Sequence, residues 1–215
     1  MAWISRSGAL TRAEMENNAD IVISYYRSIG LNDKTIAGIL GNMQAESSIN
    51  PEREEVGGTG YGLVQWTPVS VLQNHCNTLG LTPYNSGDIQ LQVIIQEILN
   101  TTGVAEWFTT SAFISNYYNS GATSDMVGIT GQDFLDNTMN WNPDKLAIMF
   151  MAGYERPSYD PNINHYNLRM QYANEWFIYM GGTPTPTNLF NSKFKWVLYA
   201  NKLRKGRKRN ARKRF

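Results

Sequence analysis

The sequence is poor in the residues that build disulfide frameworks and zinc sites. It has one cysteine, Cys76, and two histidines, His75 and His165, which lie far apart. A single cysteine can form no internal disulfide, so we expect Cys76 to be a buried thiol. One cysteine and two distant histidines do not supply the four ligands of a structural zinc site. No metal and no other cofactor is therefore expected.

Long apolar runs are also absent. No uncharged apolar run approaches the roughly 20 residues that span a bilayer, although 42% of the 215 residues are hydrophobic. The N-terminal stretch MAWISRSGALTRAE lacks the apolar segment of a secretory signal. This composition argues against a membrane span and is sufficient for the core of one domain.

Basic residues are scarce until the C-terminal end of the chain. Eleven of the 19 Lys and Arg lie from Lys193 onward, whereas all 18 acidic residues precede it. Residues 1–192 therefore carry eight basic against 18 acidic side chains, a formal charge of −10, and residues 193–215 carry +11. This segregation predicts an acidic globule with a basic tail. We expect residues 202–215 to contact a polyanion, such as nucleic acid, or an acidic protein surface.

Capping and breaking residues predict a helix-rich domain. Thr11 and Glu14 form a capping-box pattern at the start of a first helix, which ends by Gly30. A second helix is expected from about residue 32 to Glu46. Further helices are expected over residues 69–78, 89–99, 132–139, 143–154 and 164–180. The Asn-, Ser- and Tyr-rich stretch 108–128 gives no clear pattern.

The segment after the second helix predicts a small β element. Residues 57–60, GGTG, are typical of a turn, and Tyr61–Trp66 of a short strand or hairpin arm. Residues 181–187, GGTPTPT, are typical of a linker. The predicted fold class is therefore α+β and predominantly α, with residues 1–182 as one domain and 183–215 as a linker and basic tail.

Glu46 is the residue that most suggests chemistry. It closes the otherwise uncharged run IAGILGNMQAE, at the expected end of the second helix. Burial beside apolar groups and the negative end of a helix both favour the protonated form of a carboxyl group. Such an acid can protonate the leaving oxygen when a sugar–sugar bond is cleaved. A lone glutamate at a helix end is otherwise an ordinary solvated residue.

Residues of sugar-binding type follow Glu46 and favour the chemical interpretation. Ser47 offers a hydroxyl group, and Gln65 can both donate and accept hydrogen bonds. Tyr61 and Trp66 present flat faces for sugar rings. The combination predicts a saccharide site beside Glu46.

Three sequence strings carry a resemblance to a known family. Glu46-Ser47 followed by GYGLVQWTP (residues 60–68) resembles the E-S … G-[LYF]-[LMV]-Q pattern of the lysozyme-like superfamily, which includes lytic transglycosylases and goose-type lysozymes. Together with GNMQAESSINP (41–51) and MFMAGYERP (149–157), it more closely resembles the phage tail lysozymes. These are virion enzymes at the tail tip of short-tailed phages that infect Gram-positive bacteria. The similarity spans roughly residues 10 to 180.

The resemblance implies a fold, a reaction and a location. It implies a lysozyme-like fold and cleavage of the β-1,4 bond between N-acetylmuramic acid and N-acetylglucosamine, by which the virion opens the host wall for genome entry. Glu46 matches the catalytic acid, Tyr61 and Gln65 the glycan-contacting strand, and Tyr154 a tyrosine near the acid. The implied partners are peptidoglycan and other virion tail proteins.

A second carboxylate is the open question. A two-carboxylate mechanism needs a partner roughly 5–9.5 Å from the acid. Glu54 and Glu55, on the loop after the second helix, are the candidates, and Glu155 is expected to pair with the adjacent Arg156 or to cap a helix. Many members of the superfamily use a group of the substrate instead. A hydrolase, a lytic transglycosylase and a non-catalytic glycan-binding tail protein therefore remain as alternatives.

Overall fold

The expected helices form around side-chain caps that the sequence provides. In a computed structural model of the chain, which describes residues 1–183, Thr11 accepts a hydrogen bond from the backbone N–H of Glu14, whose carboxylate accepts one from the N–H of Thr11. Asn32 caps the second helix in the same way, through its side-chain oxygen. These bonds satisfy N–H groups that have no partner within the helix.

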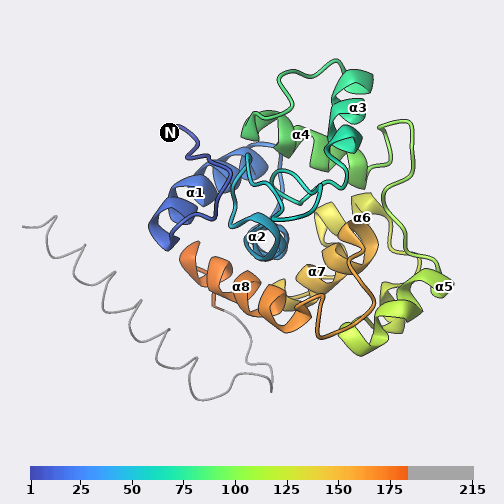
Figure 1. Cartoon of the computed structure of the whole chain (residues 1–215). Coiled ribbons are helices and arrows are strands. Elements are labelled where there is room, and N and C mark those ends of the chain that lie inside the picture. The colour runs from blue at the N-terminus through green and yellow to red at the C-terminus, as the bar shows by residue number, and fades with distance from the viewer. Residues whose placement is uncertain (184–215) are drawn as a thin grey trace, which may run out of the picture. The chain divides into compact units, whose positions relative to one another are not determined.

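The described residues are predominantly helical (Figure 1). In chain order the helices are α1 (Arg12–Ser28), α2 (Asp33–Ser47), α3 (Val69–Leu79), α4 (Gly87–Ile98), α5 (Ser111–Ile114), η1 (Ser115–Ser120), η2 (Ser124–Met126), α6 (Gly131–Asp136), α7 (Pro143–Phe150), η3 (Met151–Glu155) and α8 (Tyr166–Tyr179). None of the helices within residues 1–183 is long and apolar enough to cross a bilayer. The expected end of the linker and the basic tail 202–215 lie outside the described residues.

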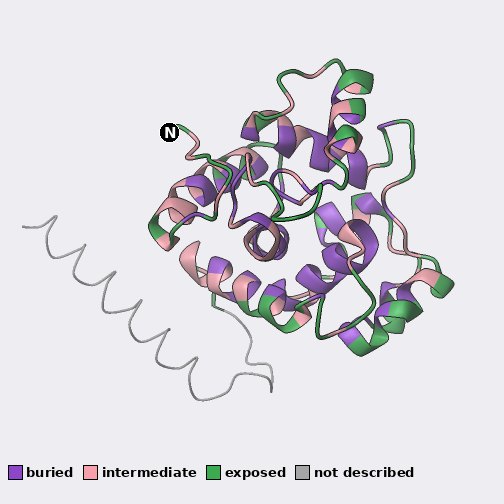
Figure 2. Cartoon of the chain, in the orientation of Figure 1, coloured by how far each residue is buried: buried purple, intermediate pink, exposed green. Residues whose placement is uncertain are grey.

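Helix α2 lies at the centre of the domain, with α1, α7 and α8 packed around it (Figure 1). It is buried over most of its length, as Figure 2 shows. Two glycines permit the closest approaches. A Cβ atom on Gly38 would lie 2.9 Å from the Leu146 Cβ, and one on Gly41 would lie 2.6 Å from the backbone oxygen of Arg169. The pattern of glycines therefore brings α7 and α8 against the helix that carries Glu46.

The expected strand at Tyr61–Trp66 is reduced to two isolated bridges, between Glu54 and Tyr61 and between Tyr61 and Trp66. No longer strand occurs within residues 1–183. The reason is local, because Gly62 and Gln65 have positive φ angles of 82° and 55°. A chain in that conformation turns back on itself and cannot extend a β ladder.

The expected helix 143–154 also differs from the observed structure. α7 ends at Phe150, and the chain continues as the wider π-helical turn η3 through Glu155. Such turns interrupt the α-helical register, so that successive side chains leave in directions that a regular helix does not offer. Residues 108–128, which the sequence left open, form α5 and the two short 3₁₀ turns η1 and η2.

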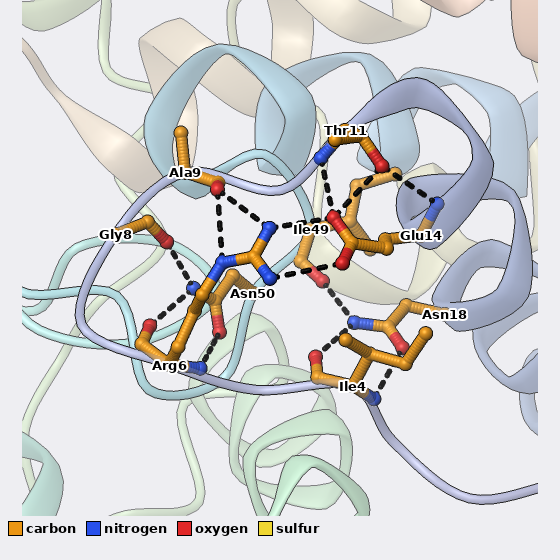
Figure 3. A network of polar contacts seen from close by, with 9 residues as sticks. All are labelled: Ile4, Arg6, Gly8, Ala9, Thr11, Glu14, Asn18, Ile49 and Asn50. Atoms are coloured by element: carbon orange, nitrogen blue, oxygen red, sulfur yellow. Dashed lines mark hydrogen bonds and ion pairs between the residues drawn. The ribbon is translucent and has the colours of Figure 1, made fainter.

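Polar contacts with the N-terminal segment fix the chain where it leaves α2 (Figure 3). Asn18 on α1 donates to the carbonyl groups of Ile4 and Ile49, both at 2.8 Å. Asn50 donates to the carbonyl groups of Arg6 and Gly8 at 2.5 and 2.7 Å. Because Ile49 has a φ of 56°, which is unfavourable for a β-branched residue, these bonds hold a turn that would otherwise relax. The C-terminal end of α2 is thereby fixed.

Candidate active site

A cleft of about 620 Å³ opens beside the C-terminal end of α2. Its lining includes five glutamates, which are Glu46, Glu55, Glu97, Glu106 and Glu155, but only two arginines, Arg53 and Arg156. Gln65, Trp66 and Tyr154 also line it. This excess of acidic side chains disfavours a phosphate-rich ligand in the cleft and suits chemistry in which positive charge develops.

Glu46 is held by a buried arginine that comes from α8. The Arg169 guanidinium donates from Nη2 to Oε1 of Glu46, and from Nη1 to Oε2 of Glu155 at 2.7 Å. Nη1 also reaches Oδ1 of Asn42 at 2.8 Å, and Nε donates to the carbonyl group of Asn164 at 2.9 Å. Arg169, on α8, thus joins α2, the η3 turn and the segment just before α8 at one point.

The two carboxyl groups that share Arg169 differ in exposure. The side chain of Glu46 is 21% exposed and that of Glu155 only 3%. Burial, and then the charge of Glu46, raise the pKa of Glu155 well above its usual value, although Arg169 acts in the opposite direction. Both carboxyl groups line the cleft, but Glu46 is the more exposed of the two and Glu155 is almost fully buried.

A second buried carboxylate, Glu97 on α4, lies at the base of the cleft. It accepts hydrogen bonds from Trp66 Nε1 at 2.8 and 3.0 Å and from the hydroxyl group of Tyr154, and its Oε1 lies 2.5 Å from His75 Nδ1. Burial and the charge of Glu97 raise the pKa of Tyr154 well above its usual value, so the phenol stays protonated and donates. The hydrogen bond with Glu97 raises the pKa of His75.

The ion pairs around η3 differ from those expected from the sequence. Glu155 pairs with Arg169 rather than with the adjacent Arg156. Arg156 instead pairs with Glu106, at 2.6 Å from Nη2 to Oε2. Because η3 is a wide turn, the consecutive side chains of Tyr154, Glu155 and Arg156 reach three different partners.

Several of the predicted site residues meet at this cleft. Glu46, Gln65, Trp66, Tyr154 and Glu55 all line it. Trp66 and Tyr154 are mostly buried, and both donate a hydrogen bond to Glu97. Gln65 donates from Nε2 to the carbonyl groups of Arg53 and Gly62, which fixes its amide.

Other predicted residues lie elsewhere. Ser47 is buried, and its hydroxyl lies within hydrogen-bond distance of the carbonyl oxygens of Met43 and Leu63. Tyr61 does not line the cleft and packs edge-on against Tyr84. Glu54 is likewise outside the lining.

Glu55 lines the cleft, but its carboxylate accepts hydrogen bonds from the backbone of its own loop. Oε2 accepts from the backbone N–H groups of Thr59 and Gly60 at 3.1 and 3.0 Å. These bonds close the loop that precedes Tyr61. No group of three or more His, Cys, Asp or Glu side chains among residues 1–183 is arranged to hold a metal ion.

Sequence reasoning missed Glu97 and Arg169. Both carried a signal that could have been used, since each is a single charged residue within a largely uncharged helical stretch, LQVIIQEIL and NLRMQYAN. A charge at such a place is buried only when it is paired. The sequence could not show that Tyr154 donates to Glu97, or that Arg169 reaches Glu46, since the members of each pair lie more than fifty residues apart.

Comparisons with known proteins place the chain among phage proteins. The phage tail lysozyme family matches residues 17–180. Morphogenesis protein 1 of Bacillus phage B103 is 32% identical over 180 residues, which cover 81% of this chain and 42% of that protein. The chain thus spans about two fifths of the length of this relative.

The chain belongs to the phage tail lysozyme family. Its predominantly helical architecture is consistent with the lysozyme-like fold that the sequence predicts. The family indicates a glycosidase-type, lysozyme-like protein associated with the phage particle.

Proposed function

We propose that this chain is a peptidoglycan hydrolase of the phage tail that cleaves the β-1,4 bond between N-acetylmuramic acid and N-acetylglucosamine. One observation carries the proposal: Glu46, at the edge of a 620 Å³ cleft, is the partly exposed member of a carboxyl pair anchored by the buried Arg169. In this role Glu46 protonates the glycosidic oxygen as the bond to it breaks. A positioned general acid typically contributes about 10²–10⁴ in rate.

The remaining acidic lining supports the same reaction. Cleavage of a glycosidic bond develops positive charge on the sugar ring, and the carboxylates of Glu55, Glu97 and Glu106 line the cleft where that charge would form. Glu55 is the candidate for a second carboxylate, since Glu54 lies outside the lining. Gln65 is the polar side chain best placed to contact the sugar amides and hydroxyls.

Replacement of Glu46 by glutamine tests the assignment. Glu46→Gln keeps the shape of the side chain but cannot deliver a proton, so release of muropeptides from purified sacculi should fall by about 10²–10⁴. Circular dichroism and melting temperature should show that the variant is folded. Glu175→Gln on α8, whose side chain pairs with Gln171 and Arg12, is the matched control and should cut at the wild-type rate. Undiminished cleavage by Glu46→Gln would remove Glu46 from the catalytic role.

The chemical form of the products decides between two reactions at the same bond. Mass spectrometry of the released muropeptides should give reducing ends if water attacks. Ends of the 1,6-anhydro type would instead identify a lytic transglycosylase, in which the 6-hydroxyl of the substrate attacks. Both reactions use Glu46 as the acid.

A second candidate is a structural tail protein that binds glycan without cutting it. It is favoured by the ion pair between Arg169 and Glu46, which occupies one oxygen of that carboxyl group, and by the relative that is named a morphogenesis protein. Under this alternative the protein would sediment with sacculi and release no soluble muropeptide, and Glu46→Gln would leave the bound fraction unchanged.

A further inference from the structure

Glu46 and Glu155 face one guanidinium group between them. Arg169 bonds to one oxygen of each carboxyl, Oε1 of Glu46 and Oε2 of Glu155. The other oxygen of Glu155, Oε1, is fully buried and accepts no hydrogen bond from the N–H and O–H groups of residues 1–183. A buried carboxylate oxygen without a donor is costly, because its lost hydration is not replaced.

The charge of this cluster is balanced only if it holds a proton. Two ionised carboxylates and one guanidinium leave a net charge of −1 among side chains of which Arg169 is 4% and Glu155 3% exposed. One proton on the pair of carboxyls makes the cluster neutral. It also supplies the donor that Glu155 Oε1 lacks, since a protonated carboxyl can bond to its neighbour.

We propose that Glu155 is a positioning residue that keeps a proton within the Glu46–Glu155 pair, from which Glu46 delivers it to the glycosidic oxygen. The inference rests on the proposed function and adds a source for the catalytic proton. Like charges held close together cannot both ionise freely, and Glu155 imposes this condition on Glu46.

The direction in which the pKa of Glu155 is shifted agrees with this proposal. Burial and the carboxylate of Glu46 raise the pKa of Glu155, and a hydrogen bond between the two carboxyl groups acts in the same sense. The titratable and charged groups that face Glu155 are Glu46 from α2, Arg169 from α8 and, on its own turn, Tyr154. Of these only Arg169 favours the ionised form.

The proton balances over one hydrolytic turnover. As the bond between the anomeric carbon and the glycosidic oxygen breaks, that oxygen takes the proton of the pair and leaves as a hydroxyl group. The pair is then fully ionised, while positive charge lies on the sugar ring. Water adds to the anomeric carbon, and the proton that it loses returns to Glu46 and restores the neutral cluster.

Glu155→Gln is the decisive variant. Glutamine preserves the volume, the acceptor for Arg169 and a donor toward Glu46, but it removes the shared proton. On sacculi, the wild type should cut near pH 7, whereas Glu155→Gln should lose about tenfold or more at that pH and recover part of the rate in acid. A merely structural role would lower the rate equally at every pH, and that result would overturn the proposal. Glu175→Gln should keep the wild-type pH profile.

A stability measurement tests the proton without any cleavage. A group whose pKa is raised on folding stabilises the protein fully below its unfolded value, about 4.3 for glutamate, and loses that contribution as the pH rises through the folded pKa. The melting temperature of the wild type should therefore fall relative to that of Glu155→Gln as the pH is raised above this value. Parallel curves would overturn the shared proton, whether or not sacculi are cut.

A third measurement uses the wild-type chain alone, in case the variant does not fold. Carbon-13 spectra of protein labelled at the glutamate carboxyls should contain a carboxyl that is still protonated at pH 7, and Glu46→Gln should change its titration. Fully ionised glutamates at pH 7 would contradict the proposal. A protonated carboxyl in a chain that releases no muropeptide would leave the pair intact and reject the hydrolase instead.

Discussion

The buried side chain of Glu97 connects three separate segments of the chain. Its side chain is 1% exposed, and it meets Trp66 from the loop after α2, His75 from α3 and Tyr154 from η3. These three donors come from separate parts of the chain, so the carboxylate joins the loop that carries Gln65 to the turn that carries Glu155. We infer that the base of the cleft owes its shape to this residue.

Replacement of Glu97 by glutamine should destabilise the protein in a pH-dependent way. Removing one partner of a buried pair costs about 3 kcal/mol, because glutamine keeps a single acceptor for three donors. The raised pKa of His75 stabilises the fold fully below its unfolded value, about 6.5, and this contribution is lost as the pH rises. The loss measured by urea unfolding should therefore be larger at pH 5.5 than at pH 8.5.

A double-mutant cycle with His75→Gln isolates the part that belongs to the pair. In the His75→Gln background, the cost of Glu97→Gln should be smaller and should no longer depend on pH in this range. An equal cost in both backgrounds would mean that Trp66 and Tyr154, not His75, account for the effect.

For single residues, the sequence predicts which side chains line the cleft better than it predicts the partners of buried charged side chains. Glu46 could be placed at the candidate site because an acid that closes an uncharged run is visible in a linear pattern, and Gln65 because it follows a glycine-rich turn. Glu155 was expected to pair with Arg156 or to cap a helix, yet it pairs with Arg169. Nothing in the local sequence encodes a partner supplied by a helix that lies later in the chain.

At the scale of elements, the site depends on how closely α8 approaches α2. Arg169 reaches Glu46 because Gly41, five residues earlier on α2, leaves room for the backbone of α8. The Cβ of an alanine there would lie 2.6 Å from the oxygen of Arg169 and 2.7 Å from the nitrogen of Ala173. Both are backbone atoms, so the helix itself would have to move.

Gly41→Ala should therefore weaken both stability and activity. Alanine is the better helix former by about 1 kcal/mol, but overpacking typically costs about 1–3 kcal/mol, and the displaced atoms belong to the residue that holds the carboxyl pair. We expect a net loss of about 1–2 kcal/mol in urea unfolding, together with slower cleavage of sacculi. Gly8→Ala is the control, since nothing lies within 4 Å of its added Cβ. Equal behaviour of the two variants would show that the helices can separate freely.

Helix boundaries followed from the sequence where caps are local. Thr11 with Glu14 and Asn32 act through bonds within a single turn, and each helix begins where the pattern predicts. The strand expected at Tyr61–Trp66 could not be tested by local bonds of this kind. The residue types of this segment do not reveal the positive φ angle of Gln65. A ladder needs a partner strand, and the described chain supplies only single bridges.

At the scale of the whole molecule, charge of opposite sign gathers around the cleft and at the end of the sequence. The cleft is lined mainly by acidic side chains, whereas residues 202–215 hold nine Lys and Arg. A basic segment attracts polyanions and an acidic cleft repels them. We therefore expect the polyanion to bind the tail and the glycan to bind the cleft, without competition between them. The two activities should be separable.

A truncated chain, residues 1–187, tests this separation. It should cut short soluble glycan fragments at the full-length rate, because Glu46, Glu155 and Arg169 all lie within it. Binding of the full-length chain to a polyanion such as double-stranded DNA should fall steeply with salt, by about 10³–10⁵ between 50 and 200 mM for six to ten phosphate contacts. A full-length control with the nine basic residues of 202–215 changed to serine should behave like the truncation. If that control still binds the polyanion while it cuts normally, residues 1–187 bind the polyanion. The assignment of polyanion binding to residues 202–215 would then be wrong.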